Sequence, residues 1–163
     1  AKMLGAEVIA CASSADKIQR LTDLGADHVI NYKDTDFSKW AINKFGKPQR
    51  RNYEGGVDVV INFTGGDTWA PSLKCVKRGG KILVCGATAG FDPKEDLRYV
   101  WSFELKIIGS NSFYDENLTA LMDLIEHGKM KPVIDAVLPL EKAAEGLRLI
   151  ENREVFGKVV LCP

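Results

Sequence analysis

The chain has 163 residues, and its 22 lysine and arginine side chains balance 22 aspartate and glutamate side chains. Apolar residues make up 45% and charged residues 27%, as in ordinary globular proteins. The zero net charge argues against a nucleic-acid partner, because binding phosphates needs a basic surplus or a basic cluster. No run of about 18 apolar residues occurs, so the sequence predicts no membrane span.

The metal-ligating residue types are few and scattered: Cys11, Cys75, Cys85, Cys162, His28 and His127. A zinc site needs clustered thiolates or imidazoles, so we expect this chain to bind no metal. Cys11 and Cys85 stand in apolar runs and are expected to be buried and inert. Unpaired cysteines of this kind favour a reducing compartment, and we expect the protein to be cytoplasmic.

The first third of the chain alternates between apolar runs and capped helical segments. In chain order the predicted elements are a last helical turn at 1–5, a strand at 7–12, a helix at 13–25, a strand at 28–32, a helix from about 34 to 45 and a solvent loop at 46–56. Ser13 or Ser14 is the predicted cap of the first full helix, and Gly25 its end.

The remaining two thirds continue the alternation. The predicted elements are a strand at 57–63, a helix near 67–76, a turn at Gly79-Gly80, a strand at 81–85, a loop to about 95, a short helix at 96–103, a strand at 105–109, a helix at 115–127, a strand at 133–138, a helix at 140–150 and a strand at 155–162. Such alternation predicts an α/β fold whose parallel sheet has helices on both faces. Ligands of these folds bind at the carboxyl ends of the strands.

The residues after the first two strands are suited to an adenosine phosphate. A dinucleotide-binding fold that prefers NAD carries an acidic residue here for the ribose, and none is present. Ser13, Ser14 and Lys17 at a helix N-terminus instead favour a 2′-phosphate, hence NADP. The alternative is that a serine only caps the helix and Lys17 is solvated. Tyr32 either covers an adenine or is an ordinary tyrosine at a strand end.

Small and polar residues follow the next three strands as well. They are Thr64-Gly65-Gly66, Gly86-Ala87-Thr88 and Ser110-Asn111-Ser112-Phe113. Glycine at such a place lets a ligand approach the backbone closely.

Several phrases in this order resemble a known family. They are LGADHVINYKD, GGVDVVINFTGG, GGKILVCGATAG, LKIIGS and GKMKPVIDAVLPLEKAAEGLRLIENREVFGKVVL. Together they are similar to the C-terminal half of the medium-chain dehydrogenase/reductases, nearest to zinc-type alcohol dehydrogenases and quinone oxidoreductase-like proteins. The resemblance covers essentially the whole chain.

The resemblance implies a Rossmann-type doubly wound fold. It implies a cofactor-binding domain at residues 1–131 and a segment at 132–163 that completes a substrate domain. It places the adenosine end of the cofactor, NADP(H) in preference to NAD(H), at Ser13, Ser14, Lys17 and Tyr32. The ribose or pyrophosphate falls at Thr64 and Gly65 and the nicotinamide at Gly86, Ala87 and Thr88, with Ser112, Phe113, Phe156 and Lys158 also near the cofactor. It further implies a homodimer through the edge strand near 105–110.

The chain departs from the family at its start. The family's first strand and G-x-G-x-x-G loop are not in this sequence. The two strands that would flank the missing strand in the sheet are therefore expected to be roughly 9.6 Å apart. Any zinc would belong to the missing domain. We expect an NADP(H)-preferring parent enzyme acting on an alcohol, carbonyl or quinone, and an inactive chain when alone. The alternative is a non-catalytic nucleotide-binding or dimerisation module, or an inactive fragment.

Overall fold

The computed structural model describes all 163 residues, which form two compact units, Ala1–Asn111 and Ser112–Pro163. The first unit contains η1 (Lys2–Leu4), β1 (Ile9–Ala12), α1 (Ala15–Asp23), β2 (His28–Asn31), α2 (Phe37–Phe45), β3 (Val57–Asn62), η2 (Gly66–Thr68), α3 (Trp69–Cys75), β4 (Val76–Val84), α4 (Leu97–Ser102) and β5 (Lys106–Gly109). The second contains α5 (Asp115–Glu126), β6 (Ile134–Pro139), η3 (Leu140–Lys142), α6 (Ala143–Glu151) and β7 (Lys158–Cys162). None of the helices is long and apolar enough to cross a membrane.

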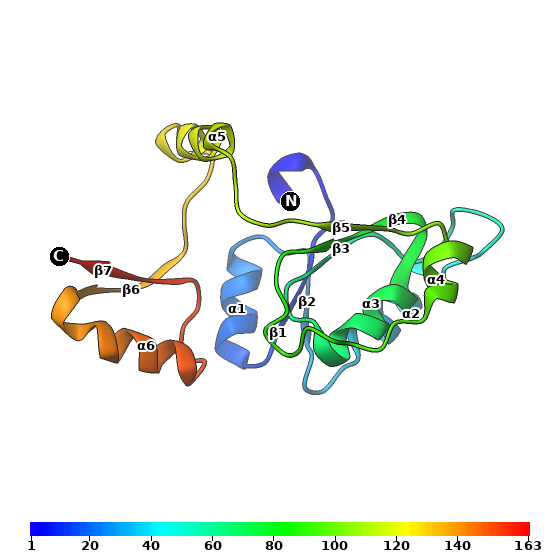
Figure 1. Ribbon diagram of the computed structural model, residues 1–163, viewed down its shortest axis with the longest axis horizontal. Helices are drawn as coiled ribbons and strands as arrows, with labels where there is room; N and C mark the ends of the chain where they lie inside the picture. Colours follow the sequence, from blue (N-terminus) through cyan, green and yellow to red (C-terminus); the bar gives the residue numbers. More distant parts are fainter. The chain divides into compact units, whose positions relative to one another are not determined.

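The strands of the first unit are parallel and form two sheets. One sheet pairs β1 with β2, and the other has the order β3-β4-β5. Figure 1 shows α1 on one side of these strands and α2 and α3 on the other. The predicted doubly wound α/β fold is therefore confirmed. β1 and β2 are not hydrogen-bonded to the sheet that contains β3, in agreement with the break that the sequence predicts.

The predicted turn at Gly79-Gly80 is instead a bulge within a longer strand. β4 begins at Val76, which pairs with Val57, and the ladder resumes only where Lys81 pairs with Val59. The intervening residues leave the ladder, with Gly79 in the left-handed region at φ 74°. The glycines thus bend β4 without ending it, because pairing with β3 continues on both sides of them.

The core of the first unit lies between α3, β4 and α4. It consists of Trp69, Leu73, Val76, Ile82, Phe103 and Leu105, none more than 8% exposed. Each such side chain contributes about 1.5–3 kcal/mol by leaving water. Asp36 and Asp96 cap the flanking helices α2 and α4 by accepting hydrogen bonds from backbone N–H groups in the first turn.

The second unit contains a parallel β6-β7 pair connected through α6. A Cβ atom on Gly146 of α6 would lie 3.1 Å from the side chain of Val159, so this glycine allows the helix to pack tightly on the sheet. The two compact units divide between Asn111 and Ser112. The predicted functional boundary between residues 131 and 132 stays a prediction.

The expected burial of Cys11 and Cys85 is wrong. Both are exposed, and Cys75 is the buried cysteine. Cys85 is exposed because it follows the end of β4, and Cys11 because it lies in a sheet of only two strands. Burial raises the pKa of the Cys75 thiol to about 12. Desolvation by surrounding protein atoms also raises the pKa of the Cys11 thiol, although part of this residue is exposed.

Candidate functional site

The structure brings together the four residues predicted to hold an adenosine. Because β1 and β2 are parallel, their carboxyl ends lie at one edge, and the Tyr32 N–H donates to the Ala12 carbonyl at 3.1 Å. Ser13 and Ser14 connect β1 to α1, whose first turn contains Lys17. Tyr32 is 48% exposed, so its ring is free to be covered by a ligand.

Ser14 has a structural role at the start of α1. It is the N-cap of α1, and its Oγ accepts a hydrogen bond from the Lys17 N–H at 3.4 Å. This bond is long, so the hydroxyl holds the N–H only weakly. The structure therefore confirms the capping role, and a phosphate role for the same hydroxyl and for Lys17 stays a prediction.

The loops after β3 and β4 lie against one another. The Ala89 N–H donates to the Thr64 carbonyl at 2.7 Å, and the Gly66 N–H donates to the Gly90 carbonyl at 2.8 Å. Gly65 has φ 67°, and a Cβ atom there would lie 2.3 Å from the Gly90 oxygen. Gly65 is thus needed for the approach of the two loops, whatever ligand they bind.

The predicted nicotinamide and ribose residues belong to this pair of loops. Thr64 and Gly65 follow β3, whereas Gly86, Ala87 and Thr88 follow β4. A Cβ atom on Gly65 would also lie 2.9 Å from that of Ala87, which places the two predicted groups in contact. They form a narrow platform of backbone and small side chains, which suits the close approach of a flat or extended ligand.

Sequence reasoning missed Asn62 as a residue of this site. It is the last residue of β3 and only 5% exposed. Its Oδ1 accepts hydrogen bonds from the N–H groups of Thr64 at 3.0 Å and Gly65 at 2.9 Å. The signal in the sequence was a polar residue inside the apolar run of residues 57–63, where an amide must find partners.

The other four predicted residues lie in the second unit. Ser112 and Phe113 follow β5 and are exposed, whereas Phe156 is half-buried and Lys158 begins β7. Ser112 has a left-handed backbone, with φ 59°. These residues belong to a different compact unit from the other predicted cofactor residues, and their part in cofactor binding stays a prediction.

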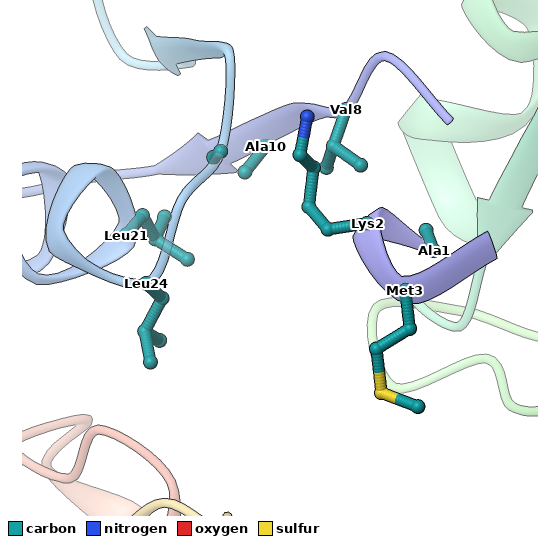
Figure 2. Close-up of a pocket in the computed structure, with 8 residues that line it drawn as sticks. Ala1, Lys2, Met3, Val8, Ala10, Leu21 and Leu24 are labelled. Atoms are coloured by element: carbon teal, nitrogen blue, oxygen red, sulfur yellow. The ribbon is translucent and has the colours of Figure 1, made fainter. Parts of the chain in front are cut away.

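An apolar hollow of about 280 Å³ lies elsewhere in the first unit. Figure 2 shows Leu21 of α1 and Leu24, which follows this helix, on one side of it and Lys2 and Met3 of η1 on the other. None of the predicted cofactor residues lines this hollow. The Lys2 ammonium is paired with Asp27 at 2.8 Å, so it offers no free charge to a ligand.

The side chains do not fit a metal. No group of three or more His, Cys, Asp or Glu side chains is arranged to hold a metal ion. Catalytic zinc needs three protein ligands, so no zinc-dependent step is assigned to the residues of this chain.

Comparison with known proteins gives one consistent family. Residues 24–161 match the family model described as zinc-binding dehydrogenase. The acryloyl-coenzyme A reductase of Sulfurisphaera tokodaii is 33% identical over 100% of this chain and 45% of its own length.

Solved structures agree in fold. The crystal structure of an NAD-dependent alcohol dehydrogenase is 40% identical, with a TM-score of 0.87 over 99% of this chain and 45% of that chain. The 2-octenoyl-CoA carboxylase reductase CinF, solved with NADP and 2-octenoyl-CoA, is 30% identical, with a TM-score of 0.84 over 98% of this chain and 38% of that chain. The chain thus spans less than half the length of these three relatives.

Proposed function

Because this chain belongs to the zinc-binding dehydrogenase family of medium-chain dehydrogenase/reductases, we propose that it is the cofactor-binding part of an NAD(P)(H)-dependent oxidoreductase. The enzyme transfers hydride between nicotinamide and an alcohol, a carbonyl compound or a quinone. The observation that carries the proposal is the platform made by the loops after β3 and β4, next to parallel strand ends in a doubly wound fold.

The chain's own residues bind and orient in this proposal. The bound cofactor supplies the redox chemistry. Thr64 and Gly65 present backbone to its ribose or pyrophosphate, and Gly86, Ala87 and Thr88 leave room beside its nicotinamide. The relatives include an acryloyl-coenzyme A reductase and a 2-octenoyl-CoA carboxylase reductase, so an α,β-unsaturated thioester is a further candidate substrate.

NADP(H) is the proposed cofactor. No acidic side chain occupies the end of β1, whereas Ser13 and Ser14 lie at the N-terminus of α1 beside Lys17. Backbone N–H groups, hydroxyls and an ammonium together are suited to a phosphate. The NADP-bound relative CinF supports this preference, and the NAD-dependent alcohol dehydrogenase shows that the fold also serves NAD.

Titration with NADPH and NADH tests the proposal. The protein is expected to bind NADPH more tightly, and Lys17→Ala to weaken NADPH binding by about 1.5–3 kcal/mol, the range for hydrogen bonds to a charged group. NADH affinity is expected to stay unchanged. Lys44→Ala, which removes an exposed lysine from α2, is the matched control. Equal losses for both cofactors would refute the phosphate role of Lys17.

The open edge of β5 supports a homodimer. β5 is the last strand of its sheet, and all four of its residues are exposed. The Ser110 N–H bonds to the Val84 carbonyl, so by alternation Ile108 also points its N–H toward β4 and Ile107 points its N–H to the open edge. Ile107→Pro is expected to abolish a dimer seen by sedimentation, and Ile107→Val to preserve it. A dimer that survives Ile107→Pro forms elsewhere.

A non-catalytic module is the alternative function, favoured if the protein dimerises and binds neither cofactor. The four cysteines are free, which supports a reducing compartment such as the cytoplasm.

A further inference from the structure

We propose that Asn62 is a positioning residue that holds the loops after β3 and β4 in one cofactor-facing arrangement. The inference deepens the proposed function and rests on it, because the loops matter to catalysis only if a cofactor lies on them. Asn62 does not reach the ligand in this proposal. It acts through the backbone of Thr64 and Gly65.

The side-chain amide of Asn62 uses its whole hydrogen-bonding capacity. Its Oδ1 accepts from the N–H groups of Thr64 and Gly65, and its Nδ2 donates to the hydroxyls of Thr68 at 3.1 Å and Ser72 at 3.0 Å. An asparagine has two acceptor and two donor positions, so none is left over. The amide thus joins the loop after β3 to the start of the following helix.

The two hydroxyls are themselves oriented to accept from Asn62. The Thr68 hydroxyl donates to the Gly65 carbonyl at 2.7 Å, and the Ser72 hydroxyl donates to the Thr68 carbonyl at 2.8 Å. Each hydroxyl therefore turns a lone pair toward the Asn62 amide. Ser72 is only 1% exposed, and the network lies where water cannot replace a lost bond easily.

The constraint passes from the first loop to the second through the backbone. Asn62 fixes the N–H groups of Thr64 and Gly65, and the carbonyl of the same Thr64 accepts the Ala89 N–H at 2.7 Å. The next residue, Gly66, donates to the Gly90 carbonyl at 2.8 Å. A change in the peptide planes at residues 64 and 65 must therefore also move residues 89 and 90, which are hydrogen-bonded to this loop.

A merely structural asparagine would stabilise the whole unit without this local effect. Amide hydrogen exchange separates the two roles, because it reads each N–H group individually. Asn62→Ala removes the single oxygen that accepts both loop N–H groups. Asn62→Asp keeps an oxygen that accepts both loop N–H groups, and the hydroxyls of Thr68 and Ser72 can rotate to donate to the second oxygen, which replaces the amide NH2 group.

Exchange is measured by NMR on the protein without cofactor. In Asn62→Ala, Thr64 and Gly65 are expected to exchange about tenfold faster, and Gly66 and Ala89 to accelerate by a similar factor, as for the loss of about one well-formed hydrogen bond. Ile82 in the core should change by less than about threefold. Asn62→Asp should restore the protection. Asn62→Ser, whose hydroxyl is too short to hold both N–H groups, replaces the alanine variant if that variant does not fold.

Ser72→Ala is the matched control, because it removes one buried partner of Asn62 and leaves both loop N–H groups bonded. In this variant, the N–H groups of Thr64 and Gly65 are expected to exchange at rates within about threefold of those in the unsubstituted protein. Acceleration of Ile82 together with the loops in Asn62→Ala would show a general loss of stability. Unchanged exchange at Gly66 and Ala89 would show that the loops are not coupled. Either result overturns the proposal.

NADPH titration of the same variants adds the functional readout. Asn62→Ala is expected to raise the Kd for NADPH about tenfold, and Asn62→Asp to stay within about threefold of the unsubstituted protein. If Asn62→Ala shows the loop-specific exchange and an unchanged Kd, the loops are coupled but do not serve the cofactor, and the proposal fails at that step. If the unsubstituted protein binds no NADPH, the proposed function fails, and the exchange experiment still decides whether Asn62 couples the loops.

Discussion

Replacing Gly65 by alanine tests the close approach of the loops after β3 and β4. The new Cβ atom would lie 2.3 Å from the Gly90 oxygen and 2.9 Å from the Ala87 Cβ atom. Neither neighbour is the far end of a flexible side chain, so the loops must move apart. Gly65 also has φ 67°, a backbone region that L-residues adopt at a cost.

Two separate costs give the expected size of the effect. Gly65 combines φ 67° with ψ −148°, a region used almost only by glycine, so an L-residue there costs about 1–3 kcal/mol. Forcing an extra carbon into a packed contact costs about 1–3 kcal/mol more. Gly25→Ala is the matched control, because Gly25 has φ 91° but nothing within 4 Å of the added Cβ atom. The control bears a cost for its positive φ but no packing cost, so Gly65→Ala should be less stable than Gly25→Ala by at least about 1–3 kcal/mol.

Urea unfolding followed by tryptophan fluorescence measures this difference. The three tryptophans, Trp40, Trp69 and Trp101, all lie in the first unit with both glycines. Gly65→Ala is also expected to weaken NADPH binding, whereas Gly25→Ala is not. The stability effects of separate substitutions add only to within about 0.5 kcal/mol. Losses of stability in Gly65→Ala and Gly25→Ala that agree within this margin would therefore refute the contact between the loops.

Two further predictions concern titratable groups of the first unit. The Arg98 guanidinium hydrogen-bonds Asp96 and lowers the pKa of that carboxyl from 3.8 to about 2. A lowered pKa stabilises the fold above the ordinary value, and this stabilisation is lost as the pH falls toward 2. The difference in Tm between the unsubstituted protein and Asp96→Asn should therefore shrink from pH 7 to pH 2, and a constant difference would contradict the pairing. The buried Cys75 thiol, with its pKa of about 12, should resist iodoacetamide at pH 8 while exposed Cys85 and Cys162 are modified, as mass spectrometry of the digested protein will show. Modification of Cys75 in the folded protein would contradict its burial.

Local signals predicted the elements well because they act within a few residues. The sequence predicts Ser13 or Ser14 as a helix cap, and Ser14 is the cap in the structure. The helix predicted from about residue 34 has Asp36 as its N-cap and ends at Phe45, as expected. The sequence also predicts that Ser13 and Tyr32 lie near one another, because parallel strands bring their carboxyl ends to one edge of the sheet.

Features that depend on distant partners could not be predicted in the same way. An apolar run does not say which strands will be covered, so Cys11 was wrongly expected to be buried. The bulge at Gly79 depends on pairing with β3 on both sides of it. Asn62 gave only the signal of a polar residue in a strand, and its importance follows from four partners that the chain brings to it in three dimensions.

The central claim is that the carboxyl ends of the strands form the cofactor site. Amide chemical shifts recorded while NADPH is added to the protein test this most directly. We expect shifts at Ser14, Lys17 and Tyr32 and at the loops of residues 64–66 and 86–90. Shifts centred on the far ends of the strands, near Gly56 before β3, or no shifts at saturating NADPH, would contradict it.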